Sequence, residues 1–195
     1  MIDYRELYHK FRERLASNEE LKTAEITRRI KDFFRHEFAG HFVAPADGVK
    51  EFLVDVFVSN RNPRAFSNES GASEFRAILA VESELGGEGA GSPQYLMRNV
   101  LEDFAKLLVV QCDYKVLIFT SLPYAREEDH LDGRLRDIRS MHSSAGHPGN
   151  ILLIHLRSSP QRTQNGNPTN PKVSLCREGM SAYVLSRGMD VQKLA

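Results

Sequence analysis

Two stretches of helical periodicity open the chain. Residues 2–16 place apolar side chains three or four positions apart, which predicts an amphipathic helix. A second helix is expected over residues 17–38, with Ser17 or Asn18 as its N-cap and Glu20 completing a capping box. The sequence therefore predicts two N-terminal helices, each with one apolar face.

Strand patterns follow from residue 41 onward. The runs "VKEFLVDVFVS" (49–59) and "EFRAILAVESELG" (74–86) are rich in β-branched and aromatic residues, and they predict two long strands. The stretch 94–112 has apolar residues at helical spacing. The next apolar run, 114–122, does not alternate with polar residues, which is typical of a strand buried on both faces.

The last third of the chain is more polar. A charged stretch at 126–142 predicts a helix that faces solvent, and "NILLIHLR" at 150–157 predicts another strong strand. The segment 158–172 is polar and contains proline and glycine, so we expect a surface loop or disorder there. Residues 173–186 are expected to add a final strand or hairpin.

The order of these elements predicts an α/β fold, with a mixed central sheet flanked by helices and two helices before it. A chain of 195 residues is long enough to bury one such core, so we expect a single domain over 1–195. Its N-terminal helices would occupy 1–40, its core 41–157, and its polar loop with the C-terminal strand or hairpin 158–195.

Composition narrows the function classes. Lysine plus arginine and aspartate plus glutamate both number 26, so the net charge is zero, which disfavours a protein that coats nucleic acid. The two cysteines, Cys112 and Cys176, fit no metal-ligand spacing. Neither a signal peptide nor a membrane-spanning run is predicted. We therefore expect a cytoplasmic protein with no membrane partner.

Three carboxylates in the two long strands are the strongest candidates for chemistry. Glu82 and Glu84 end an apolar run and share one face at strand spacing. Asp55 is flanked by valines in the preceding strand and would lie beside them if the strands pair. Carboxylates are costly to bury unless compensated, and their hard oxygens suit Mg²⁺ or Mn²⁺. The alternative is a Glu-x-Glu that is simply exposed at the end of an edge strand.

The pattern "VDVFV … ILAVESELGG … LEDFAKLLVVQCDYKVLIFTS" resembles the PD-(D/E)XK nuclease superfamily, which has the restriction-endonuclease-like fold. Members have a leading helix, a meander of strands, a further helix and another strand. The resemblance covers residues 20–121 and implies that Asp55 is the first motif acid and Glu82 the second. It also implies a metal-dependent nuclease that acts on nucleic acid, DNA above all. Nucleases that cut both strands often act as homodimers, although the sequence names no interface.

One position departs from the superfamily motif. Glu84 stands where the motif usually has lysine, although some restriction endonucleases have glutamate there. Lys106, on the following predicted helix, resembles a migrated catalytic lysine that orients water or steadies a phosphate. The alternative is a solvated lysine paired with Glu102 at i−4. Glu37, in the second helix, resembles the accessory acid of some members. The resemblance thus implies a catalytic set of Asp55, Glu82, Glu84 and Lys106, with the three acids as ligands of Mg²⁺ or Mn²⁺.

Other functions stay open from the sequence. The glutamate at the lysine position and the zero net charge favour a catalytically inactive module with the nuclease fold, for interaction or DNA binding in a defence- or phage-related assembly. The loop "GGEGAG" (86–91) is a weaker indication of nucleotide binding, because it lacks the Gly-Lys-Ser/Thr ending of a phosphate-binding loop. The basic stripe at 134–139 is a weak hypothesis of phosphate contact, and a solvated helix face is its alternative.

Overall fold

The structure is a computed structural model, and it describes residues 2–19, 21–45, 53–64, 74–87 and 90–194. The helices in these ranges are α1 (Tyr4–Leu15), α2 (Thr23–Glu37), α3 (Pro93–Val109), α4 (His130–Ala145) and the short 3-10 helix η2 (Arg177–Gly179). The strands are β1 (Phe42–Ala44), β2 (Val56–Ser59), β3 (Ala77–Glu84), β4 (Tyr114–Ser121), β5 (Ile151–Arg162), β6 (Pro168–Val173), β7 (Met180–Leu185) and β8 (Gln192–Leu194).

All eight strands belong to one mixed sheet, which confirms the predicted α/β class. The strand order is β1-β2-β3-β4-β5-β7-β8, and β6 pairs with β5 away from this path. β1, β2 and β3 form an antiparallel meander, β3, β4 and β5 run parallel, and β7 and β8 return antiparallel. α3 and α4 are the long connections that the parallel strands need.

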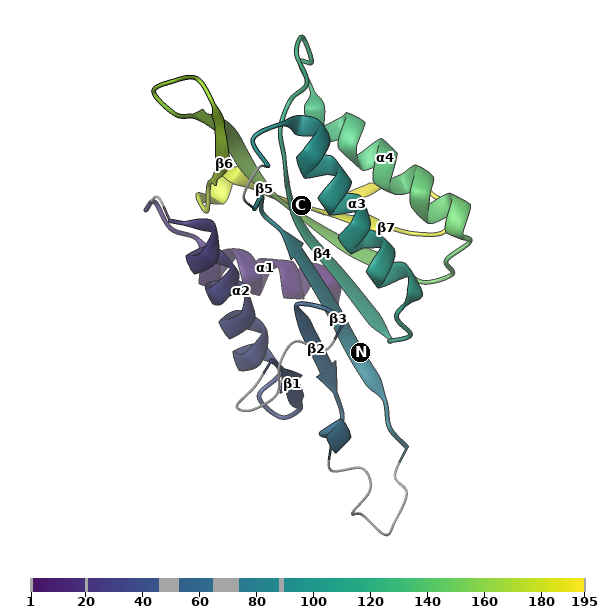
Figure 1. Ribbon diagram of the computed structural model, residues 1–195. Coiled ribbons are helices and arrows are strands. Elements are labelled where there is room, and N and C mark those ends of the chain that lie inside the picture. The colour runs from purple at the N-terminus through teal and green to yellow at the C-terminus, as the bar shows by residue number, and fades with distance from the viewer. Residues whose placement is uncertain (1, 20, 46–52, 65–73, 88–89, 195) are drawn as a thin grey trace.

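Helices cover both faces of the sheet, as predicted. Figure 1 shows α3 and α4 in front of the sheet and α1 behind it. Alternation along β3 sends Leu79 and Val81 into the apolar cluster with α1 and α2, and sends Ala80 into the cluster with α3 and α4. Within the described part of the chain, the helices are all too short or too polar to cross a membrane.

The two N-terminal helices are present, but the predicted cap of the second is wrong. α2 begins at Thr23, and Lys22 at its N-cap makes no side-chain cap bond. Ser17 instead belongs to a turn between the helices, where its N–H donates to the carbonyl of Leu175. The connection between α1 and α2 is therefore longer than the local pattern indicates, because α2 begins only at Thr23. Glu20 lies outside the described residues.

The strand predicted over 49–59 is shorter in the structure. β2 starts at Val56, and residues 49–52 lie outside the described part of the chain. Leu53 is 77% exposed and has a positive φ of 65°, which bulky side chains rarely adopt. The chain therefore turns at Leu53 and enters the sheet immediately after Asp55.

Two predictions for the last third are corrected. The segment 158–172 is not a loop, because β5 continues to Arg162 and pairs with β6 as an antiparallel ribbon. Its polar side chains do not prevent the backbone hydrogen bonds that form this ribbon. α4 begins at His130 and is not simply solvated, since Leu135 and Ile138 are buried. Arg134 is buried as well, 2.8 Å from Glu127.

Phe104 tests the packing of α3 on the sheet. Its side chain is fully buried, so Phe104→Ala should leave a cavity and lower the free energy of unfolding by about 3–5 kcal/mol. Val109 of the same helix is 80% exposed, and Val109→Ala should change this free energy by less than about 0.5 kcal/mol. Urea unfolding followed by circular dichroism measures both. Equal effects of the two substitutions would contradict this placement of α3.

Candidate functional site

Glu82 is the buried centre of the candidate site. It lies in β3 opposite Leu117 of β4, and only 2% of its surface is exposed. Alternation along β3 turns its side chain to the same face as Ala80, which packs with α3 and α4. The alternative that this Glu-x-Glu is simply exposed to solvent is therefore wrong for Glu82.

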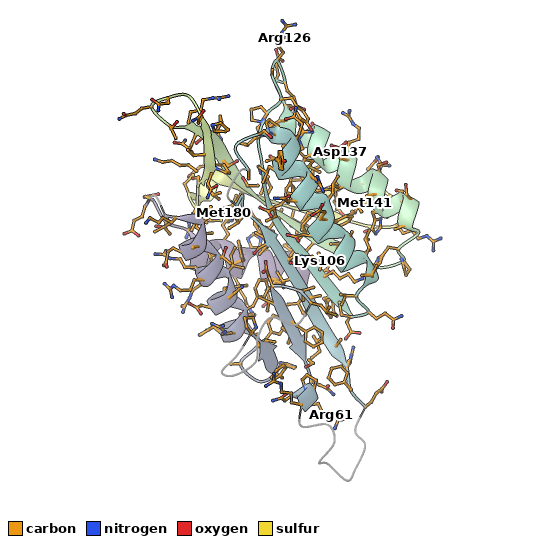
Figure 2. The ribbon with its side chains drawn as sticks, viewed as in Figure 1. Arg61, Lys106, Arg126, Asp137, Met141 and Met180 are labelled. Carbon is orange, nitrogen blue, oxygen red and sulfur yellow. The ribbon has the colours of Figure 1, made fainter. Side chains whose placement is uncertain are left out.

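Lys106 of α3, labelled in Figure 2, supplies a positive charge close to Glu82. Its Nζ lies 3.3 Å from Oε1 of Glu82 and donates a 2.6 Å hydrogen bond to Oδ1 of Asp103. Asp103 lies one helical turn earlier on α3. The alternative that Lys106 is a solvated partner of Glu102 is wrong, because Glu102 pairs with Arg98. Lys106 is half exposed, so its side chain contacts both the buried Glu82 and the solvent.

Asp55, immediately before β2, binds β3 through its side chain. Its Oδ2 accepts hydrogen bonds from N and Oγ of Ser83, at 2.9 and 2.6 Å. The side chain of Asp55 thereby satisfies a backbone N–H of β3 beyond the last β2–β3 pair. Its Oδ1 lies 3.7 Å from Nζ of Lys31 on α2. The predicted pairing of the two strands is confirmed, and the charge of Asp55 acts on Glu82.

Glu84 ends β3 and turns back onto the chain that follows. Its Oε1 accepts a 2.6 Å hydrogen bond from N of Gly86. Gly86 has a φ of 85°, and a Cβ there would lie 2.6 Å from Cγ of Pro171 in β6. Only glycine fits both the backbone angle and the contact. Glu84 is therefore fixed where the loop after β3 packs on β6.

Contacts with β6 explain two glycines of the "GGEGAG" stretch without a nucleotide. A Cβ at Gly91 would overlap Pro168 of β6, just as one at Gly86 would overlap Pro171. A Cβ at Gly87 would meet no atom within 4 Å, and residues 88–89 lie outside the described part of the chain. Gly86 and Gly91 therefore have a structural reason in their packing against β6.

Burial and repulsion set the protonation of Glu82. Burial raises the pKa of Glu82 to about 8, and the charges of Asp103 and Asp55 raise it as well. Lys106 opposes this rise only in part. Burial lowers the pKa of Lys106, but its contacts with Asp103 and Glu82 outweigh that effect and raise the pKa overall. Lys106 therefore stays charged while Glu82 titrates near neutral pH.

The two neighbouring acids are shifted in the same direction. Burial raises the pKa of Glu84 against the hydrogen bond from Gly86, and repulsion by Asp103 and Asp55 adds to the rise. Burial also raises the pKa of Asp103, with partial compensation by the hydrogen bond from Lys106. A cluster of acids whose pKa values are raised by burial and by one another is typical of functional sites.

The structure brings together the residues predicted from the sequence and adds two more. One group contains Asp55, Glu82, Glu84 and Lys106, together with Asp103 and Lys31, which the sequence reading did not single out. Asp103 could have been predicted from the sequence, because it lies three residues before Lys106 and such a pair shares one face of a helix. Lys31 has no comparable signal, because α2 approaches β2 only through tertiary packing. Glu37, at the end of α2, pairs instead with Lys10 of α1 at 2.5 Å.

The acids have the donor chemistry of a Mg²⁺ or Mn²⁺ site but not its arrangement. Oε1 of Glu82 is buried and has no hydrogen-bond partner in the described ranges, since its ion pair with Lys106 lacks hydrogen-bond geometry. Such an oxygen suits a hard cation. Among the described residues, however, no three acids, histidines or cysteines are placed to hold a metal ion together. Asp55 and Glu84 instead use oxygens to bind Ser83 and Gly86.

Comparisons with known proteins do not supply a family. No family model, no curated protein and no solved structure matches this chain. The chemistry of the site therefore follows from its own geometry and charges.

The raised pKa of Glu82 makes stability depend on pH. Between the ordinary value of 4.5 and about 8, the folded protein keeps a proton that the unfolded chain has released. Stability from this group is therefore full below pH 4.5 and is lost as the pH rises through about 8. Without divalent ions, Glu82→Gln should flatten the decline in unfolding free energy between pH 5.5 and 7.5 by about 1 kcal/mol per pH unit.

Urea unfolding at several pH values measures this slope. The matched control is Glu102→Gln, which removes a carboxylate whose side chain is 60% exposed on α3. The control should follow the wild-type slope. If Glu82→Gln also followed it, the buried acid would not be the group that titrates.

Proposed function

We propose that the protein is a metal-dependent nuclease that hydrolyses phosphodiester bonds of nucleic acid, with DNA as the preferred substrate. The observation that supports this most is the convergence of acids around buried Glu82 beside a half-exposed lysine. Asp55 reaches this point from the start of β2 and Asp103 from α3. Three different parts of the chain thus bring carboxylates near enough for their charges to raise the pKa of Glu82, which a structural ion pair does not require.

The order of elements around the site also supports the proposal. α2 leads into the antiparallel meander of β1, β2 and β3, and α3 then leads to β4, which is parallel to β3. A leading helix, a meander, a helix and a further strand are what the resemblance to the PD-(D/E)XK superfamily implies. Of the positions proposed for its two acids, Glu82 lies on β3 and Asp55 lies immediately before β2, and these are the two central strands of this unit.

In this proposal Asp55, Glu82 and Asp103 hold one or two Mg²⁺ or Mn²⁺ ions, and Glu84 joins them after releasing the N–H of Gly86. A divalent cation supplies a water of lowered pKa and stabilises charge on phosphate oxygens. Glu82 must lose its proton to act as a ligand, so metal affinity rises with pH. Lys106 stands at the mouth of the cluster and donates hydrogen bonds to the phosphate or to the attacking water.

A second candidate is a catalytically inactive module with the nuclease fold. Two observations favour it: Glu84 is bound to the backbone of Gly86, and the described residues contain no ready arrangement for a metal ion. In such a module Lys106 stays permanently paired with Glu82 and Asp103, in place of a cation. The two candidates differ in whether a divalent ion displaces these contacts.

Cleavage assays test the nuclease proposal. Plasmid, single-stranded DNA and RNA are incubated with the protein in Mg²⁺ or Mn²⁺, and products are resolved on gels. Glu82→Gln, Asp103→Asn and Lys106→Met should each lower the cleavage rate by about 100-fold or more, because each removes a ligand or a charge at the reacting phosphate. Glu102→Gln is the matched control and should keep the wild-type rate.

Calorimetric titration with Mn²⁺ separates the two candidates. The nuclease should bind Mn²⁺ more tightly at pH 8 than at pH 6, and Glu82→Gln should abolish this difference. A protein that binds no Mn²⁺ at either pH and cuts none of the substrates would be the inactive module.

A further inference from the structure

A cavity of about 800 Å³ lies between the turn that joins α1 to α2 and the β5–β6 ribbon. In Figure 1 this region is on the left, where the start of α2 lies below β6. The backbone hydrogen bond from Ser17 to Leu175 ties its two walls together. The cavity therefore lies between two segments that are distant in the sequence and joined by a hydrogen bond.

The walls of this cavity carry more positive than negative charge. Among the described residues that line it, Lys22, Arg157 and Lys172 are basic and Glu19, which lies 3.7 Å from Arg29, is acidic; the neighbouring Glu20 lies outside the described part of the chain. Lys22 and Arg157 are exposed. Within the described part of the chain, neither of these two side chains has an ion pair or a side-chain hydrogen bond. Two cations thus face the cavity without an anion of their own.

Polar groups of the kind that contact phosphates surround the two cations. Hydroxyl and amide side chains from both walls line the cavity: Ser17, Asn18, Thr23, Ser158, Ser159, Asn170 and Ser174. Such side chains, together with lysine and arginine, make most contacts between proteins and nucleic-acid backbones. The two cations and these polar side chains can therefore contact the phosphates of a polyanion.

The cavity is connected to the carboxylate cluster along two paths. Pro171, in its wall, packs on Gly86, whose N–H binds Glu84. α2 provides the second path, because Lys22 lines the cavity and Lys31 faces Asp55. The rise of a helix places those two lysines about 14 Å apart along α2. A DNA strand covers that length in about four nucleotides.

We propose that this cavity binds the phosphate backbone of the nucleic acid at a second point along the strand, away from the position of cleavage at the carboxylate cluster. Lys22 and Arg157 each neutralise one backbone phosphate there. The contacts are independent of base sequence, so they fix the position of the strand without selecting its bases. This inference rests on the proposed function, because it gives the same substrate a second point of attachment.

The test is the binding of fluorescein-labelled DNA by the full chain, measured by fluorescence anisotropy in EDTA at several salt concentrations. A 30-base-pair duplex and a single strand of the same sequence are the two probes. The double variant Lys22→Gln with Arg157→Gln should bind about tenfold more weakly. For the duplex, the slope of log affinity against log salt should be shallower by about two for this variant. Each phosphate contact that is lost removes the release of about one counterion on binding.

The matched control is Arg187→Gln with Lys193→Gln, which removes the same charge from exposed residues at the β7–β8 end of the sheet. It should bind both probes like the wild type. Thermal unfolding of the double variants checks that each is folded. If the cavity variant binds DNA with wild-type affinity and slope while the wild type cleaves it, the inference is overturned and the nuclease proposal stands.

The remaining outcomes separate the two proposals further. Binding that depends on Lys22 and Arg157 without any cleavage keeps the cavity as a backbone site and rejects the nuclease. A wild type that neither binds nor cleaves either probe rejects both. Vesicles of phosphatidylserine and phosphatidylcholine serve as a competing polyanion. Binding to these vesicles but not to DNA would assign the cavity to a lipid surface and overturn the inference.

Discussion

The burial of one carboxylate in the middle of a sheet is the constraint on which this structure depends. Glu82 is enclosed on the face that α3 covers, where a charge is costly unless it is compensated. α3 compensates it by placing Lys106 over β3, and Asp103 holds that lysine in position. α3, the helix that connects the parallel strands β3 and β4, thus also supplies the charge that offsets the burial of Glu82.

The local pattern of apolar and polar residues is sufficient to predict those parts of the site that belong to a single strand. The apolar run before Glu82 predicts β3, and alternation predicts the face on which its acid lies, because both depend only on strand geometry. Asp103 and Lys31 were missed because a helix pattern does not say which residue of a neighbouring strand each side chain meets. The β5–β6 ribbon was missed because backbone hydrogen bonds, rather than apolar side chains, form it.

The two candidate functions differ in how the charges of one cluster are balanced. As the structure stands, Lys106 and protons offset the acids, because burial and the charges of Asp103 and Asp55 raise the pKa of Glu82 to about 8. A divalent cation would take over both tasks, since it neutralises several carboxylates at once. In the proposed metal-bound state, Glu84 would have to give up its bond to Gly86 before it faces a cation. A glutamate at that position therefore does not by itself decide between an active and an inactive site.

The contact between Gly86 and Pro171 has a mechanical consequence. Gly86 binds Glu84 through its N–H and touches the β5–β6 ribbon through its Cα, with no room for a side chain between them. Any side chain larger than hydrogen at position 86 would therefore have to displace either the ribbon or the end of β3. Such a displacement would also disturb the backbone N–H that holds Glu84.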